Sequence, residues 1–249
     1  MSTYVLIHGS WHGSWCWKRV RQALAAKGHD VYTPTLTGLG ERSHLASPAV
    51  NLSTHIADVV NLIGWEQLAD VILCGHSYAG WVISGVADQI PHRLRALVYL
   101  DAYVVEDGEC FFDHLPPEEA ERRRQQARTT GDGWKVDPLP AEVFHVNPRD
   151  RAWVDAQCTV QPIGTYEERL HLRGGIQQIS DITHILCTGW ERTPFPASHE
   201  RAKRRGWKTR TMTCGHEAML DCPEELAALL MEIDSGERSD ASVTPRGSG

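Results

Sequence analysis

The residue with the strongest chemical signature is Ser77, which lies in the run Gly75-His76-Ser77-Tyr78-Ala79-Gly80 between an apolar segment and a helix-like one. A serine hydroxyl is a weak nucleophile at neutral pH, so it needs an exposed position and a neighbouring base. A sharp strand-to-helix turn provides the exposure and demands small residues two positions before and after the serine. Gly75 and Ala79 meet that demand, with alanine in place of the usual second glycine. The motif therefore predicts that Ser77 is a nucleophile.

A glycine-rich turn, His8 to Gly13, follows the first apolar segment of the chain. When a nucleophile attacks a carbonyl, backbone amides must stabilise the oxygen that becomes negatively charged. In turns of the Ser77 type, one amide comes from the residue after the nucleophile and another from an early strand-end loop. Tyr78 and Ser10 occupy these two positions, so we expect their amides to form an oxyanion hole. His8 and His12 are expected to stabilise the turn.

His216 is the candidate base, in the run Thr213-Cys214-Gly215-His216-Glu217. The base of a serine nucleophile of this kind comes last in chain order, on a loop after the final strand. Among the thirteen histidines, only His216 combines a late loop, a preceding glycine and a following helix-like segment.

The elements that must position these residues alternate between strand and helix. Short apolar runs at 4–7, 30–33, 70–75, 95–101, 182–187 and 207–213 predict strands, and helical spacing appears at 17–27, 53–63, 81–90, 197–205 and 223–233. Continuously apolar strands in such an alternation predict a mostly parallel sheet with helices on both faces. The expected class is therefore α/β, and with the Ser77 turn, the α/β-hydrolase fold.

The alternation of strand and helix patterns is interrupted between residues 102 and 180, a segment that is charged and contains prolines. We interpret this segment as a helical cap inserted into a core formed by residues 1–101 and 181–234. The polar end, residues 235–249, is predicted to be a disordered tail.

Charge and composition limit the classes of partner that we expect for this protein. A net charge of −7 gives no reason to expect nucleic acid or an anionic membrane, and no apolar stretch is long enough to span a bilayer. The chain begins on a strand-like run without a signal peptide, and its seven irregularly spaced cysteines are typical of free thiols in a cytoplasmic protein. Of these, Cys16, Cys214 and Cys222 fall near the candidate site and are expected to be apolar filler. We expect a small-molecule substrate and neither cofactor nor metal; a homodimer is left open.

The motifs resemble the hydroxynitrile lyase and esterase branch of the α/β-hydrolases, which includes plant methyl-salicylate-type esterases and bacterial pyrethroid and carbamate hydrolases. The likeness extends to residue 234 and is weakest in the cap. It rests on residues 5–13, Trp15, Trp17, residues 75–78 and Gly215-His216. The resemblance implies cofactor-free hydrolysis of small esters, with Ser10 and Tyr78 as oxyanion donors.

Two positions depart from that branch. Glu217 stands where the lyases carry a lysine that handles cyanide, which disfavours lyase chemistry. Trp190 stands where the branch has the aspartate that orients the histidine. Asp101, at the end of an apolar strand, is the preferred substitute, and Glu191, beside the missing aspartate, is the alternative. A dyad in which a water or a backbone carbonyl holds the imidazole is the third option.

The expected function is hydrolysis of a small, largely apolar ester, carbamate or amide through an acyl-enzyme intermediate. Trp11, Trp81 and Trp153 are the candidate walls of the substrate pocket. The alternatives are a hydroxynitrile lyase-like or lactone-processing enzyme, and a small-molecule-binding protein that has lost turnover.

Overall fold

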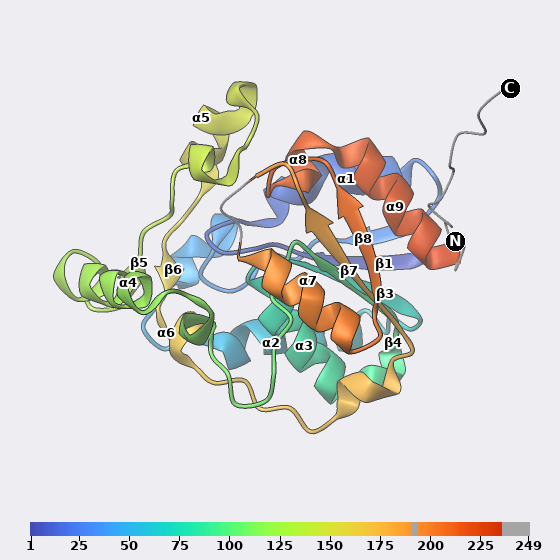
Figure 1. Ribbon diagram of the computed structural model, residues 1–249, viewed down its shortest axis with the longest axis horizontal. Helices are drawn as coiled ribbons and strands as arrows, with labels where there is room; N and C mark the ends of the chain where they lie inside the picture. Colours follow the sequence, from blue (N-terminus) through green and yellow to red (C-terminus); the bar gives the residue numbers. More distant parts are fainter. Residues whose placement is uncertain (191–193, 236–249) are drawn as a thin grey trace, which may run out of the picture.

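Residues 1–190 and 194–235 are described by the computed structural model, and six of their strands form one sheet in the order β2-β1-β3-β4-β7-β8 (Figure 1). All neighbouring strands in this sheet are parallel. The strands are β1 (Thr3–Ile7), β2 (Asp30–Tyr32), β3 (Val71–His76), β4 (Leu94–Leu100), β7 (Asp181–Cys187) and β8 (Lys208–Met212). The predicted parallel α/β fold is confirmed.

The central strands are apolar on both faces because both faces are covered. Every residue of β3 is buried, and β4 is buried except at Arg95. The outer strands β2 and β8 are only partly buried. Burial thus falls from the central strands to the outer ones. For this reason the apolar runs are most continuous in β3 and β4, the strands that lead to the candidate nucleophile and to Asp101.

Helices connect the strands and cover the two faces. They are α1 (Lys18–Ala25), α2 (Leu52–Trp65), α3 (Ala79–Gln89), α7 (Phe195–Arg204), α8 (Ala218–Asp221) and α9 (Pro223–Ser235). Crossovers between parallel strands are right-handed, so α1, which leads toward β2, lies on the opposite face from α2, α3 and α7, which lead the other way. Accordingly, α1 packs with α9 and α2 packs with α3 (Figure 1).

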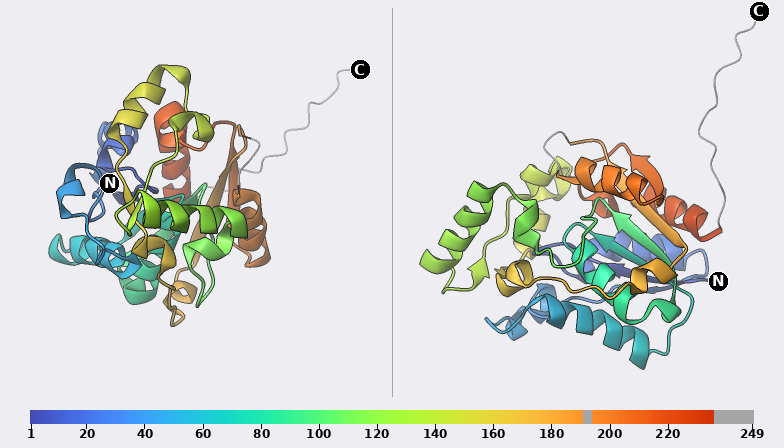
Figure 2. Two further views of the ribbon diagram at one scale, coloured as in Figure 1. Left: turned by 90° about the vertical axis from the view of Figure 1, so that its left-hand side faces the viewer. Right: turned by 60° about the horizontal axis from the view of Figure 1, so that its bottom comes forward.

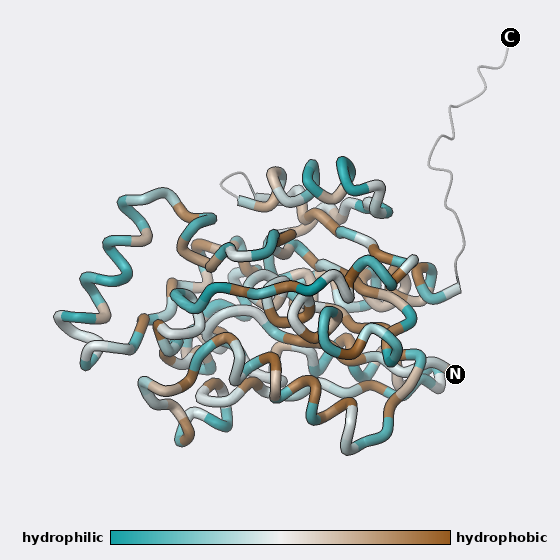
Figure 3. The backbone as a smooth tube through the Cα atoms, turned by 90° about the horizontal axis from the view of Figure 1, so that it is seen from below, coloured by the Kyte–Doolittle hydropathy of each residue, from teal (hydrophilic) through white to brown (hydrophobic). Residues whose placement is uncertain are grey.

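The segment between β4 and β7 adds no strand to this sheet; much of it stands at one end of the sheet, and its last part runs back beside α3 to the start of β7 (Figure 2). It contains α4 (Pro117–Thr129), α5 (Pro148–Gln157), the short α6 (Gly164–Glu167) and a two-stranded antiparallel ribbon of β5 (Lys135–Val136) and β6 (Gln161–Pro162). Helix α4 is largely hydrophilic, whereas the apolar positions gather toward the middle of the molecule (Figure 3). We use the name cap for residues 102–180, as in the sequence prediction.

Hydrogen bonds tie the cap to two loops of the sheet domain. The Trp11 amide donates to Gln161 Oε1 at 3.0 Å, and the Trp11 indole donates to the Val136 carbonyl at 3.1 Å. The amide of His216 donates to the carbonyl of Phe144 at 3.1 Å. The cap therefore fixes both the early glycine-rich turn and the late histidine loop.

Helix α9 extends to Ser235, one residue into the segment predicted to be a disordered tail; the rest of that segment, residues 236–249, lies outside the described residues. Within the part of the chain that the structure describes, no helix has the length and apolar character needed to cross a membrane.

The interior holds several neutral histidines whose burial makes stability depend on pH. Burial lowers the pKa of His8 to about 3 and the pKa values of His55 and His184 to about 4, against about 6.5 in an unfolded chain. Between about pH 4 and 6.5 the unfolded chain therefore binds protons that the folded chain does not, and stability falls as the pH drops.

We predict that the free energy of unfolding is lower at pH 5 than at pH 7, by up to about 2 kcal/mol for each of these histidines. Denaturant titrations at both pH values measure it. His184→Gln should reduce the pH dependence, whereas a change at the exposed His44 should leave it intact. Equal stability at the two pH values would contradict the assignment.

Gly80 in α3 has no room for a side chain, because a Cβ there would lie 2.2 Å from the carbonyl oxygen of Tyr103. Gly80→Ala should destabilise the protein by about 1–3 kcal/mol, because the backbone must shift. Gly64 in α2 faces open space, and Gly64→Ala is the matched control, expected to stabilise by about 0.5–1 kcal/mol. Denaturant unfolding compares the two; a harmless Gly80→Ala would show that the contact is not tight.

Candidate active site

Ser77 forms the sharp turn that the sequence predicts between β3 and α3. Its φ is 55°, in the left-handed region that a serine rarely adopts. A Cβ on Gly75 would lie 2.8 Å from the carbonyl oxygen of Ala79, so the turn needs glycine at that position. The backbone is held by the Ser77 amide, which donates to the carbonyl of Leu100 at 3.3 Å. This strained turn places the hydroxyl at the carboxyl end of the sheet.

The early glycine-rich turn lies directly against Ser77. A Cβ built on Gly9 would be 3.0 Å from the Cβ of Ser77, so only glycine lets the two turns approach this closely. His8 holds the turn: its Nδ1 donates to the Gly9 carbonyl at 2.8 Å, and its Nε2 accepts from the Leu36 amide at 3.0 Å. The expected turn-stabilising role of His8 thus has a direct structural basis.

The amides of Ser10 and Tyr78 are available to an incoming oxygen. Neither has a hydrogen-bond acceptor among the described residues. Ser10 follows the glycine turn, and Tyr78 precedes α3, whose N-terminal dipole favours negative charge nearby. The Tyr78 hydroxyl lies 3.0 Å from His55 Nδ1, which anchors its side chain away from the amide.

His216 and Asp101 meet at the end of the sheet. Nδ1 of His216 lies 2.8 Å from Oδ2 of Asp101, with the histidine 3% exposed and the aspartate fully buried. The carboxylate can only accept, so Nδ1 carries the hydrogen and Nε2 keeps its lone pair. Ser77 and His216 line the same cavity. The pair therefore has the tautomer that a general base requires.

Asp101 is held by two further donors. Its Oδ1 accepts from the Cys187 amide at 3.0 Å, and its Oδ2 accepts from the Trp190 indole at 3.1 Å. The residue adopts a φ of 40°, which turns the carboxylate out of the β4 direction. A buried carboxylate is costly unless its lone pairs are satisfied, and here both oxygens have donors.

Of the two candidate acids, Asp101 lies against His216, whereas Glu191 lies outside the described residues. Sequence reasoning noted that Trp190 replaces an aspartate but missed that its indole donates to Asp101. The sequence offered only a general indication of this contact, because a buried tryptophan usually needs a hydrogen-bond acceptor for its indole N–H.

The cavity in front of Ser77 has a volume of about 380 Å³ and is mostly apolar. Trp11 lines it, as predicted. The other lining residues come mainly from the cap and the loop after β7, and sequence reasoning missed them: Tyr103, Phe111, His114, Leu115, Pro116, Arg123, Leu139, Val143, Phe144, Trp190, Pro194 and Phe195.

Two predicted wall residues, Trp81 and Trp153, do not line this cavity, so these two predictions are wrong. Trp81 is fully buried in α3, where its ring meets the edge of His114 at 5.1 Å. It lies behind the cavity wall because its helix packs into the sheet. Trp153 in α5 is 38% exposed and contacts Trp15 edge-to-face, outside the lining of the cavity.

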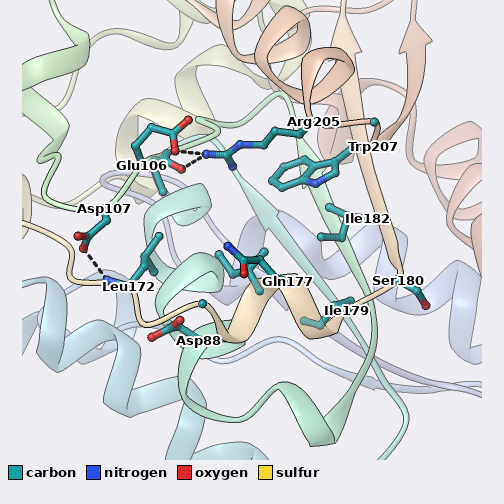
Figure 4. A pocket seen from close by; sticks show the side chains of 14 residues that line it. Asp88, Glu106, Asp107, Leu172, Gln177, Ile179, Ser180, Ile182, Arg205 and Trp207 are labelled. Atoms are coloured by element: carbon teal, nitrogen blue, oxygen red, sulfur yellow. Dashed lines mark hydrogen bonds and ion pairs between the residues drawn. The ribbon is translucent and has the colours of Figure 1, made fainter.

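A larger groove, of about 600 Å³, lies at the other end of the strands (Figure 4). Ser180 and Trp207 in its wall precede β7 and β8, whereas Ser77 and Asp101 follow their strands. The rim carries the ion pair between Arg205 and Glu106. None of the described residues that line this groove is a histidine, so a hydroxyl there has no imidazole base.

The cysteines near the site differ in burial: Cys16 and Cys214 are buried, and Cys222 is partly buried. Burial raises the pKa of Cys16 well above its usual value and the pKa of Cys222 to about 12. Cys214 Sγ lies 3.6 Å from Cys187 Sγ, a thiol pair that the sequence did not indicate. The contact with Cys187 lowers the pKa of Cys214, but Cys214 does not line the cavity in front of Ser77, so Ser77 stays the candidate nucleophile.

Comparisons with known proteins show the family and the fold of the chain. The sequence model of the alpha/beta hydrolase family matches residues 4–229. The carbendazim hydrolyzing esterase of Nocardioides sp. (strain SG-4G) is 42% identical over 241 residues, covering 94% of this chain and 100% of that protein. Methylesterase 10 of Arabidopsis thaliana is 30% identical over 262 residues, covering 92% and 90% of the two chains.

Solved structures share the architecture. An extracellular alpha/beta-hydrolase from a Paenibacillus species superposes with a TM-score of 0.81 at 25% identity, over 93% of this chain and 98% of that one. A pyrethroid hydrolase from Sphingobium faniae superposes with a TM-score of 0.73 at 22% identity, over 94% and 98%, and shows the fold alone.

We predict that Ser77 reacts with a fluorophosphonate probe, because the reagent needs an activated hydroxyl and the two free amides can hold its oxygen. Mass spectrometry of the labelled peptide locates the adduct. Ser77→Ala and heat-unfolded protein are the controls and should not label. Equal labelling of Ser77→Ala would show that another group is the nucleophile.

Proposed function

The chain belongs to the alpha/beta hydrolase family, and we propose that it is a serine hydrolase that cleaves small, largely apolar esters or carbamates. The observation that carries the proposal is the 2.8 Å hydrogen bond between His216 Nδ1 and Asp101 beside the turn that presents Ser77. This contact fixes the histidine in the tautomer that can accept a proton from a serine hydroxyl.

In the proposed reaction, Nε2 of His216 takes the proton of Ser77 as its oxygen attacks the carbonyl carbon of the substrate. The carbonyl oxygen becomes an oxyanion, which the amides of Ser10 and Tyr78 stabilise. His216 then passes the proton to the leaving alcohol or amine, and the acyl group stays on Ser77. A water deprotonated by His216 releases the acid and restores the serine.

The cavity supports the proposed substrate class. Its walls are mainly aromatic and aliphatic, which suits a flat or apolar acyl or leaving group. Arg123 is a charged residue in this otherwise mainly apolar wall, and its guanidinium carbon lies 5.2 Å from the centre of the Trp11 ring. A relative 42% identical across almost the whole chain hydrolyses carbendazim, which favours carbamates among the candidate substrates.

The site also disfavours the lyase alternative. Glu217 follows His216 and is 2% exposed, with His12 Nε2 at 3.5 Å from its Oε1. A buried carboxylate next to the base repels cyanide, whereas the lysine of the lyases attracts it.

We predict that the protein hydrolyses members of a panel of aryl esters, methyl esters and aromatic methyl carbamates, and that it releases no aldehyde from cyanohydrins. Product release, followed by chromatography, measures both reactions. Cyanohydrin cleavage without ester or carbamate hydrolysis would overturn the proposal in favour of a lyase.

Asp101→Asn should lower kcat by about a thousandfold or more, because the amide no longer favours the tautomer with a free Nε2. Glu191→Gln is the matched control and should change kcat little. The two variants differ from the parent by the same carboxylate-to-amide change, so the steady-state comparison is direct. A large loss in Glu191→Gln with an active Asp101→Asn would assign the acid to Glu191 instead.

A further inference from the structure

A second, much smaller chamber of about 20 Å³ lies beside Ser77, and two of its wall residues, His76 and Glu217, have no role in the proposed reaction. His76, His216 and Glu217 contribute to its wall. One potential ligand atom from each of the three lies within 4.8 Å of the others, and all three side chains are at least 97% buried. The chamber therefore gathers two imidazoles and a carboxylate out of contact with solvent.

The hydrogen bonds of His76 leave its second nitrogen as an acceptor. Nε2 of His76 lies 3.0 Å from the carbonyl oxygen of His216, and because a carbonyl only accepts, Nε2 carries the hydrogen. Nδ1 therefore has a lone pair. This atom is buried and has no hydrogen-bond partner among residues 1–190 and 194–235.

His216 and Glu217 also present lone pairs. Nδ1 of His216 is held by Asp101, so Nε2 is the nitrogen with the lone pair. Oε2 of Glu217 is buried and has no hydrogen-bond partner within the part of the chain that the structure describes. His12, the neighbour of Oε1, already uses its Nδ1 on the Ser10 carbonyl at 2.7 Å.

We propose that this chamber binds one divalent cation of the zinc class, with Nδ1 of His76, Nε2 of His216 and the carboxylate of Glu217 as ligands. Two histidines and one glutamate form a ligand set that Zn²⁺ uses in proteins, with a fourth position left open. A water molecule in the chamber would leave the charge of the buried carboxylate uncompensated. A cation satisfies all three and balances the charge.

This cation inhibits the enzyme, an effect that rests on the proposed function. A metal on Nε2 occupies the lone pair that must accept the Ser77 proton, so the serine is not activated. The chamber and the substrate cavity share Ser10, Trp11, Ser77, Phe144 and His216 in their walls. The cation therefore reaches its ligands from the substrate cavity, and bound substrate should slow its entry.

The test is a zinc titration of chelator-treated enzyme during hydrolysis of a chromogenic aryl ester. We expect saturable inhibition that EDTA reverses, whereas Mg²⁺, which prefers oxygen ligands, has no effect. Glu217→Gln should hydrolyse the ester without metal but need at least about tenfold more zinc for half-inhibition. Unchanged zinc sensitivity in this variant would overturn the proposal. The metal-free rate tests the proposed function separately.

Binding is also measured without turnover. Calorimetry on the inactive Ser77→Ala variant should show one zinc per chain, and X-ray absorption of wild-type protein with one equivalent of zinc should show nitrogen and oxygen ligands. Sulfur ligands, together with relief of inhibition in Cys214→Ser, would place the metal on the Cys187 and Cys214 thiols and refute the chamber. Absence of zinc binding would refute it as well.

Discussion

The hydrogen bond between Asp101 and His216 is the contact on which the rest of the site depends, and the sheet makes it difficult to form. Asp101 follows β4 and His216 follows β8, and β7 lies between these strands. The carboxylate must therefore cross the end of β7. The left-handed backbone conformation of Asp101 directs the carboxylate there. The amide of Cys187, the last residue of β7, donates a hydrogen bond to it.

Trp190 completes this arrangement from the position where resemblance places the usual acid. Its indole donates to Asp101, and its ring lies 4.9 Å from the His216 ring. Phe195 stacks on the imidazole itself, with its ring 5.1 Å from that of His216 and nearly parallel. Moving the acid to β4 thus frees the loop after β7 to provide aromatic walls, which keep water away from the buried hydrogen bond.

The sequence was sufficient to predict the local turns that carry the candidate residues. Ser77, Ser10 and His216 each lie near a glycine that leaves no room for a side chain, because a Cβ on Gly75, Gly9 or Gly215 would lie 3.0 Å or less from a neighbouring atom. The sequence could only favour Asp101 as the acid, because His216 lies 115 residues away along the chain. The strand order determines which carboxylate reaches the histidine. The pocket walls were mostly missed. They depend on how the cap packs, and a tryptophan in α3 or α5 has no sequence signal that distinguishes a cavity wall from core or surface.

Proton NMR of the ring hydrogen on Nδ1 of His216 tests the central contact most directly. A hydrogen held between an imidazole and a buried carboxylate resonates far downfield of the amides and exchanges slowly with water. The structure predicts this resonance in the wild type and in Glu191→Gln, a changed position in Trp190→Phe, and its loss in Asp101→Asn. A resonance that survives unchanged in Asp101→Asn would show that another group orients His216.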